Sequence, residues 1–390
     1  MEKYSFAHNH KTAEVQLRQF SKNKLKHYGR LRNFDFGNQK ENFVSSLSPA
    51  ISRRIINEKL IISHILKIFP YEKVEKFIQE ICWRTYWKGY LEHYPTIWKH
   101  YVKNSINKHL FNHHTYKDAM LANTGIKCFD HWISELLEGG YLHNHARMWF
   151  ASIWIHTLRL PWEIGAKLFL ENLIDADSAS NTLSWRWVAG LHTTGKTYLA
   201  NADNIRKFTK GQFYPKNQLA KSPINIGDSE HNMIDNFKYK KLNEVHVECF
   251  LIHENDLSLN RLVNCDLLLI QKSPLSTIKR SKLANQFISN ALNDFQNEIS
   301  RIIDAEIVFI HLDEFESTKN ILKSKDIKLI HTSYPSIGFL NDHLNKICKS
   351  LDVAFKFYHR EWDIKFWPHS SKGFFKLKSK IPEILRDLNY

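Results

Sequence analysis

The chain has 390 residues, more than one compact domain usually holds, so we expect two domains, each large enough to bury a core. Hydrophobic residues make up 43% and aromatic residues 13% of the sequence, which excludes a disordered protein. A net charge of +15 favours a polyanionic partner, although a surface that is merely rich in lysine explains the same surplus.

The cysteines are few and widely scattered. They are Cys82, Cys128, Cys249, Cys265 and Cys348. No two of them form a C-x-x-C pair, so we interpret them as reduced intracellular thiols rather than a disulfide framework or a zinc site. The N-terminus lacks the apolar core of a signal peptide, and no run approaches 18 apolar residues, so we expect a cytoplasmic protein that does not span a membrane.

The first predicted elements are helices. Residues 12–29 have helical potential, and residues 43–69 place Ser45, Ser46 and Ser48 ahead of an apolar periodic run, as is typical of a helix N-terminus. Hydroxyl and free N–H groups at such a terminus suit a phosphate group. Ordinary helix capping explains the same serines.

Residues 71–99 have apolar positions at helical spacing. These positions are Val74, Phe77, Ile78, Ile81 and Cys82. Glu80 and Trp83 lie three apart and therefore share one face of this helix. Downstream, His109 and His113 have the spacing of a metal pair, but no neighbouring cysteine or carboxylate completes a site, so we predict no metal.

The densest group of polar and aromatic side chains lies between residues 143 and 187. A helix is predicted from Asn144 to about Leu160, with Arg147 and Met148 on it, and the stretch IDADSASNTLSWRW follows at 174–187. Two carboxylates, an amide and two indoles are packed into that stretch. They suit a buried redox cofactor that needs anchoring and electronic tuning.

Residues 211–243 are rich in Pro, Gly, Asn and Lys and are predicted to be a linker. Beyond them strands are predicted at 245–252, 266–271, 306–312, 327–332 and 353–359, with helices at 278–303, 316–324 and 337–350. This alternation is typical of a parallel doubly wound sheet. The absence of G-x-G-x-x-G from the sequence argues against a dinucleotide dehydrogenase.

The helix predicted at 278–303 is amphipathic. The residues expected to face inward are Leu283, Phe287, Ala291, Phe295, Ile299 and Ile302.

Two passages resemble the flavin-binding domain of the DNA photolyase and cryptochrome family. LHNHARM at 142–148 and LIDADSASNTLSWRWVAG at 173–190 reproduce the order and spacing of its N-x-x-R helix and D-x-D-x-x-x-N-x-x-x-W stretch. FLIHENDLSLNR at 250–261 and WPHSSKGFFKLKSKIP at 367–382 are similar to passages of the family's α/β antenna domain, which normally comes first. The chain therefore resembles a circularly permuted member; the alternative for its second half is an unrelated Rossmann-like domain.

The resemblance implies an all-helical FAD-binding domain at 1–210, a linker at 211–243 and a Rossmann-like α/β antenna domain at 244–390. It also implies a second, light-harvesting chromophore as a possibility, without indicating which.

The same resemblance implies which residues bind FAD. Arg147 would pair with Asp175 beside the flavin, and Asp177 would bind the ring or the ribityl edge. The serine-rich turn of Ser45, Ser46 and Ser48 would hold the pyrophosphate. Asn181 would face the redox-active nitrogen, where a neutral amide adds no negative charge against the anionic reduced flavin.

Catalytic roles follow from the resemblance too. Trp83 would pack on a flipped pyrimidine dimer and Glu80 would hydrogen-bond to its base, although Thr85 replaces the third residue of the family's W-R-E triplet. Asn144, His145 and Met148 would line the substrate edge of the pocket; repair enzymes commonly have arginine where this chain has His145.

Trp185 and Trp162 correspond to the inner two tryptophans of the family's electron-transfer chain. Trp154, Trp149 and Tyr116 are the candidates for its outermost member. Packing in the core is the alternative role for these indoles.

The function expected from this resemblance is light-driven repair of pyrimidine dimers in DNA by a monomeric flavoprotein that flips the lesion out of the duplex. One alternative is a cryptochrome-like blue-light receptor with the same FAD and tryptophans. Another is a nucleic-acid-binding protein that has kept the fold without the photochemistry.

Overall fold

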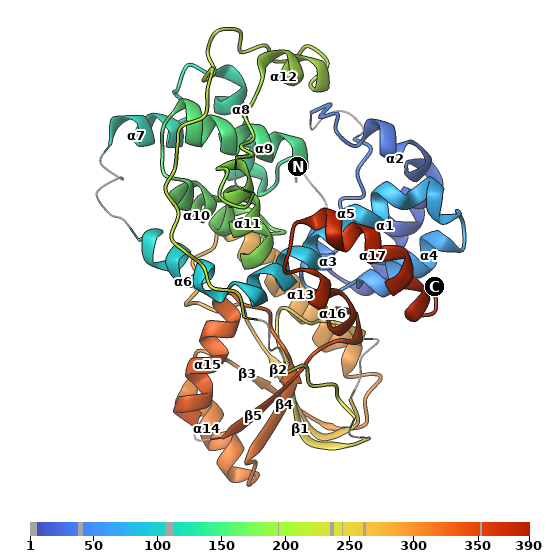
Figure 1. Cartoon of the computed structure of the whole chain (residues 1–390). Coiled ribbons are helices and arrows are strands. Elements are labelled where there is room, and N and C mark those ends of the chain that lie inside the picture. The colour runs from blue at the N-terminus through green and yellow to red at the C-terminus, as the bar shows by residue number, and fades with distance from the viewer. Residues whose placement is uncertain are drawn as a thin grey trace.

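In the computed structural model, helices occupy the chain as far as residue 208, and strands alternate with helices from residue 247 onward (Figure 1). The structure describes residues 6–37, 42–106, 113–193, 195–234, 238–243, 245–259, 263–351 and 353–390. The predicted class, a helical part followed by a parallel α/β part, is confirmed.

The helical part is built around one long helix, α5, whose apolar side chains predicted to be buried are all buried. Its elements are α1 (His10–Asn23), α2 (Leu25–Leu31), α3 (Ser48–Ser52), α4 (Glu58–Leu66), α5 (Tyr71–His93), α6 (Pro95–Asn104), α7 (His114–Met120), α8 (Lys127–Gly139), α9 (Asn144–Ser152), the π-helical turn η2 (Ile153–Thr157), α10 (Trp162–Asn172), α11 (Ser178–Val188) and α12 (Ala202–Phe208).

Two of the predicted helices are shorter than expected. The helix expected at 12–29 stops at Asn23 and restarts at Leu25. The run at 43–69 divides into α3 and α4 because Arg54 takes a left-handed conformation, with φ of 54°, and Asn57 then caps a new helix by accepting a hydrogen bond from the Leu60 N–H. Local periodicity cannot signal such a backbone reversal.

After α12 the described residues between 209 and 243 form neither helix nor strand.

The second part contains a five-stranded parallel sheet of order β3-β2-β1-β4-β5. Its elements are β1 (Val247–Ile252), β2 (Cys265–Gln271), α13 (Lys282–Ile299), β3 (Glu306–Ile310), α14 (Phe315–Ser324), β4 (Leu329–Ser333), α15 (Phe339–Leu351) and β5 (Ala354–Tyr358). Helices cover both faces of this sheet, so the predicted doubly wound arrangement is confirmed (Figure 1).

The two faces of the sheet belong to different cores. Phe250 and Ile252 of β1 pack in the cluster that includes α13 and the helical part, whereas Cys249 and Leu251 pack with α14 and α15. Alternation of side chains along a strand produces this division. The sheet is thereby tied to the helical part through one of its faces.

The predicted inward face of α13 was wrong at both ends. Leu283 is 39% exposed and Ile302 is 56% exposed, while Ala284 and Ile288 are buried. Leu283 begins a row of residues four apart, which turns about 40° per step around a helix with 3.6 residues per turn, so this first position leaves the buried face. Ile302 also lies beyond the end of the helix at Ile299.

The last three elements return to the helical part. They are α16 (Glu361–Phe366), the short η4 (Trp367–His369) and α17 (Phe374–Asp387), and they lie beside α5 (Figure 1). The Trp362 indole N–H donates to the Thr85 hydroxyl at 2.8 Å. A Cβ on Gly89 would lie 2.7 Å from the Trp367 ring, so only glycine lets α5 approach η4 this closely.

Within the described part of the chain, no helix combines the length and apolarity needed to cross a membrane. The same residues contain no group of three or more His, Cys, Asp and Glu side chains arranged to hold a metal ion. His109, a member of the histidine pair considered above, lies outside the described residues.

Candidate functional site

Two arginines and two aspartates from three segments meet inside the helical part. Arg147 on α9 donates to the Asp175 carboxylate at 3.0 Å and to the Leu142 carbonyl at 2.9 Å. Arg84 on α5 pairs with the Asp177 carboxylate and lies 3.4 Å from the Asp175 carbonyl oxygen. We call these four residues the Arg–Asp network. The predicted contact between Arg147 and Asp175 is present.

The two aspartates owe their positions to the turn between α10 and α11. Asp177 is the N-cap of α11 and accepts from the Ser180 N–H at 2.8 Å. An aspartate at this position satisfies an otherwise free N–H and interacts favourably with the helix dipole. Asp175 lies two residues earlier, so its side chain reaches α9 while that of Asp177 reaches α5.

Both aspartates are held in their charged forms. Burial opposes ionisation of Asp175, but the guanidinium groups of Arg147 and Arg84 outweigh it and lower the pKa below its usual value. For Asp177 burial is likewise outweighed, by Arg84 and the Lys88 ammonium group, and the pKa is again lowered. The network therefore keeps two negative charges beside two guanidinium groups at neutral pH.

Of the three predicted serines, Ser48 lies closest to this network. Ser48 is the first residue of α3, and its hydroxyl helps to lower the pKa of Asp175. The Ser45 hydroxyl instead lies 3.4 Å from the Leu47 N–H, and Ser46 takes a left-handed conformation with φ of 54°. The turn as a whole borders the network, with Ser48 directed toward it.

The polar groups around the network fit a flavin. The Oδ1 atom of Asp175 and the indole N–H of Trp185 are buried without a hydrogen-bond partner among the described residues. A buried polar atom that stays unpaired costs on the order of 1–3 kcal/mol. A flavin ring, with carbonyl acceptors and an imide N–H donor, can satisfy groups of both kinds.

Asn181 lies on α11, one turn after Asp177. Its side-chain N–H donates to the Ala166 carbonyl at 2.8 Å, and the residue is buried. This hydrogen bond fixes the orientation of a neutral amide four residues along the helix from the Arg–Asp network.

The tryptophans predicted to transfer electrons, Trp185 and Trp162, are buried. Their ring contacts differ from the predicted order of electron transfer from Trp162 to Trp185. The Trp185 ring lies 6.4 Å from Trp154 between centroids, and Trp154 lies 6.1 Å from Tyr116. Trp162 instead has Tyr101 at 5.8 Å and the Arg186 guanidinium over its ring. Trp154 is fully buried and Tyr116 is half-buried, so this second series runs outward from Trp185.

The residues predicted to contact a substrate lie on α5, where Glu80 is one turn before Arg84, and at the start of α9. The Glu80 carboxylate lies 3.4 Å from Arg32, and burial raises its pKa. Trp83 is half-buried, and Phe374 of α17 stacks on it with centroids 3.7 Å apart and planes 14° apart. Asn144 is exposed, and Met148 is half-buried one turn along α9.

His145 stacks on Trp149 with 4.0 Å between ring centroids, and one ring nitrogen lies 2.9 Å from the Asn33 carbonyl oxygen. Burial lowers its pKa to about 4. This side chain is therefore neutral and packed within the protein, unlike an arginine at the same position.

Sequence reasoning gave no role to Arg84 or Lys88. They lie four apart and share one face of α5, which was the available signal. Only the fold reveals that this face meets Asp177. Burial lowers the pKa of Lys88 to about 8, although Asp177 opposes that shift.

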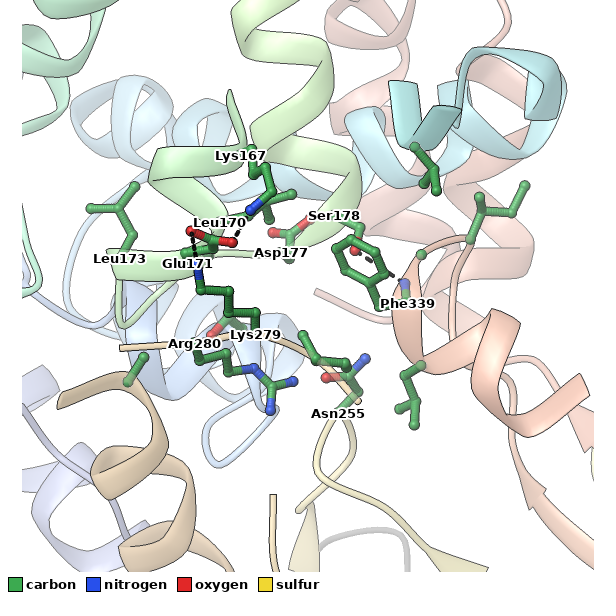
Figure 2. A pocket seen from close by; sticks show the side chains of 18 of the residues that line it. Lys167, Leu170, Glu171, Leu173, Asp177, Ser178, Asn255, Lys279, Arg280 and Phe339 are labelled. Carbon is green, nitrogen blue, oxygen red and sulfur yellow. Dashed lines mark hydrogen bonds and ion pairs between the residues drawn. The ribbon is translucent and has the colours of Figure 1, made fainter. Parts of the chain in front are cut away.

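A cavity of about 240 Å³ lies between the helical part and the α/β part (Figure 2). On one side Lys167 and Glu171 of α10 form an ion pair, and Lys279 approaches Glu171 to 3.7 Å from the opposite side. The Phe339 N–H lies 3.4 Å from the Ser178 hydroxyl across the same space. Asp177 lines this cavity, so the cavity adjoins the Arg–Asp network.

Residues 77–216 match the family described as the FAD binding domain of DNA photolyase. This segment contains the whole Arg–Asp network, Asn181 and the residues predicted to form the substrate edge, namely Glu80, Trp83, Asn144, His145 and Met148. The serine turn at 45–48 precedes it. The match therefore identifies an FAD-binding domain of the photolyase type within the helical part.

Similar curated proteins have the name deoxyribodipyrimidine photo-lyase. The one from Buchnera aphidicola is 29% identical over 236 residues, covering 54% of this chain and 46% of that protein. The one from Agrobacterium fabrum is 33% identical over 119 residues, covering 30% and 25%. The chain thus spans less than half the length of these relatives.

Two solved structures resemble the chain over about half of its length. A class III photolyase from Agrobacterium tumefaciens has a TM-score of 0.43 at 25% identity, covering 51% of this chain and 44% of that one. A cryptochrome from Synechocystis has a TM-score of 0.46 at 20% identity, covering 52% and 43%. Residues 77–216 are therefore similar to the FAD-binding domain of the DNA photolyase and cryptochrome family.

Proposed function

We propose that this protein is a light-driven, flavin-dependent enzyme that repairs pyrimidine dimers in DNA. The observation that supports this most strongly is the Arg–Asp network inside the segment that matches the photolyase FAD-binding domain. The net charge of +15 suits a DNA substrate, because cationic side chains on phosphates release condensed counterions.

Reduced FAD, when bound and excited by blue light, supplies the electron that splits the dimer. The chain's own residues hold and tune this cofactor. Asp175 offers its unpaired Oδ1 atom, while Arg147 and Arg84 keep the aspartates charged. The serine turn of Ser45, Ser46 and Ser48 would bind the pyrophosphate through hydroxyl and N–H groups.

Asn181 would favour the reduced state of the cofactor. Its amide is neutral, and the hydrogen bond to the Ala166 carbonyl fixes its orientation. A carboxylate at this position would add a negative charge near the ring and oppose the anionic form.

Trp185 would donate the first electron when oxidised flavin is photoreduced. The ring contacts favour Trp154 and Tyr116 over Trp162 as the residues that pass the charge outward, since they lead from Trp185 to a half-buried phenol. Trp162 remains the alternative that the family resemblance implies.

Glu80, Trp83, Asn144 and Met148 would border the lesion. Because burial raises the pKa of Glu80, its carboxyl group is easier to protonate and can then donate a hydrogen bond to a base. Phe374 covers one face of Trp83, so the lesion would pack against what remains exposed of that ring.

The cavity between the two parts is our candidate for a second chromophore. Its lining combines apolar side chains such as Leu170 with cationic side chains from both parts, Lys88 from the helical part and Arg280 from the α/β part. An added band in the absorption spectrum of the native protein, lost in a Leu170→Trp variant that retains FAD, would support this assignment.

The test of the proposed function uses reduced, FAD-loaded protein with dimer-containing single- and double-stranded DNA. Under blue light we expect dimers to disappear, and Trp83→Ala or Glu80→Ala should lower this rate with FAD retained. Glu248→Gln, at an exposed position of β1, is the matched control. Light-induced flavin reduction without dimer loss would instead support a blue-light receptor.

A further inference from the structure

Helix α17 presents an exposed phenylalanine beside lysines. Phe375 is 81% exposed, whereas its neighbour Phe374 is 5% exposed. Lys376 and Lys380 follow Phe375 on the outward side of the helix, and Lys372 precedes it in the preceding loop. We call Lys372, Phe375, Lys376 and Lys380 the Lys–Phe strip.

The strip lies in a stretch with strong positive charge. The sequence has no acidic residue between Asp363 and Glu383. The lysines in this interval are Lys365, Lys372, Lys376, Lys378 and Lys380. Lys380 pairs with Glu383 at 2.8 Å, and Lys365 pairs with Asp387 at 3.2 Å, so the surplus charge gathers around the first turn of α17.

The opposite side of α17 is anchored in the core. Phe374, Leu377 and Ile381 are buried, and Phe374 stacks on Trp83. The first turn of α17 is therefore held against α5, next to a residue that we propose contacts the lesion. Phe375 projects into solvent from a firmly attached helix and not from a free tail.

We infer that the Lys–Phe strip binds a single-stranded segment of nucleic acid, with a base stacked on Phe375 and backbone phosphates near Lys372 and Lys376. Aromatic rings interleaved with cationic side chains bind single strands in this way without sequence preference. The inference rests on the proposed function, because it assigns to the strip the DNA that flanks the lesion.

The charge and the size of the strip both favour nucleic acid over a protein partner. One exposed phenylalanine among lysines offers little apolar area, whereas stable protein interfaces bury about 1,600 Å². A polyanion needs only phosphates spaced along the lysines and one ring for stacking.

The experiment measures binding of a fluorescent, undamaged single-stranded oligonucleotide to the full chain in the dark. Stacking on one aromatic ring contributes about 1–3 kcal/mol, so we expect Phe375→Ala to weaken binding about five-fold or more. The double variant Lys372→Gln/Lys376→Gln should reduce the slope of log affinity against log salt by about 1.4. Matched controls are Phe309→Ala, on an exposed strand position, and Lys328→Gln/Lys349→Gln.

Unchanged affinity and slope in the strip variants, or equal losses in the controls, would overturn the inference. The inference would also be overturned if the strip variants lost binding to vesicles of anionic lipid while their binding of the oligonucleotide was undiminished. Light-driven splitting of an isolated dinucleotide dimer, which has no flanking strand, should be the same in Phe375→Ala and in the parent protein. Failure of the parent in that assay would contradict the proposed function alone, since dark binding is measured separately.

Discussion

At the scale of single residues, the Arg–Asp network concentrates the site's electrostatics in four side chains. Arg147 and Asp175 were paired from the sequence because their neighbours resemble a known motif. Arg84 escaped prediction because its contact with Asp177 depends on how α5 crosses the turn before α11. A local pattern shows that a residue is charged, but not which distant partner it meets.

Asp175→Asn should release the cofactor and weaken the fold. Arg147 would lose a charged partner at 3.0 Å, and with its side chain 21% exposed we expect a loss of about 2 kcal/mol. Urea unfolding and FAD content after reconstitution measure the two effects. Asp118→Asn, which removes the charge paired with the exposed His114, should change neither. Full FAD content in Asp175→Asn would contradict the assigned role.

The ring contacts of Trp154 make a second prediction. Trp154→Phe should slow flavin photoreduction more than Trp162→Phe does, because it removes the indole between Trp185 and Tyr116. Photoreduction is followed by the loss of oxidised-flavin absorbance under blue light. Trp362→Phe, which alters a stack with Phe366 in α16, is the control. A slower rate in Trp162→Phe alone would restore the family's expected route.

At the scale of elements, the strands and the helices between them were predicted within a few residues, since buried apolar runs and turn residues mark their limits locally. The break between α3 and α4 was not predicted, because the left-handed backbone conformation of Arg54 does not change the spacing of apolar residues in the sequence. The inward face of α13 was mispredicted at Leu283 because a four-residue repeat drifts around the helix, and at Ile302 because the helix ends at Ile299.

The contact between α10 and α11 depends on a glycine. A Cβ on Gly165 would lie 2.3 Å from the Trp185 ring and 3.0 Å from the Trp154 indole nitrogen. Gly165→Ala should therefore cost about 1–3 kcal/mol of unfolding free energy and slow photoreduction by displacing Trp185.

The control is Gly29→Ala in α2, where a Cβ would meet only a lysine side-chain carbon at 3.9 Å. Because alanine favours a helix over glycine, this variant should be stabilised by about 0.5–1 kcal/mol. Equal stability in both variants would refute the tight approach of the two helices.

At the scale of the whole molecule, the chain crosses twice between its two parts. The sequence predicted two parts and a linker, but not the return of α16 and α17 to α5, because such a contact joins residues 277 positions apart. Glu92 of α5 adds a contact between the two parts: its carboxylate accepts from the Tyr334 hydroxyl at 2.9 Å and from the Ile337 N–H at 2.8 Å.

Glu92 makes this junction sensitive to pH. Burial raises its pKa to about 7, above the value of about 4.3 in an unfolded chain. The folded state therefore favours the protonated acid, and stability on the order of 3 kcal/mol, present below pH 4, is lost as the pH rises through 7.

Glu92→Gln should remove this dependence, because glutamine is neutral at every pH, can accept from the Ile337 N–H and can donate to the Tyr334 oxygen. Urea unfolding at pH 5 and pH 8 compares the two proteins. A parent protein whose stability falls no more than that of Glu92→Gln would contradict the buried, protonated state.

The central claim is that the Arg–Asp network holds a flavin, and reconstitution tests it most directly. Purified apoprotein is mixed with FAD, freed of excess cofactor and assayed for bound flavin by absorbance. We predict one FAD per chain for the parent protein and for Asp118→Asn, and little or none for Asp175→Asn. A colourless parent protein, or equal binding by all three, would contradict the account.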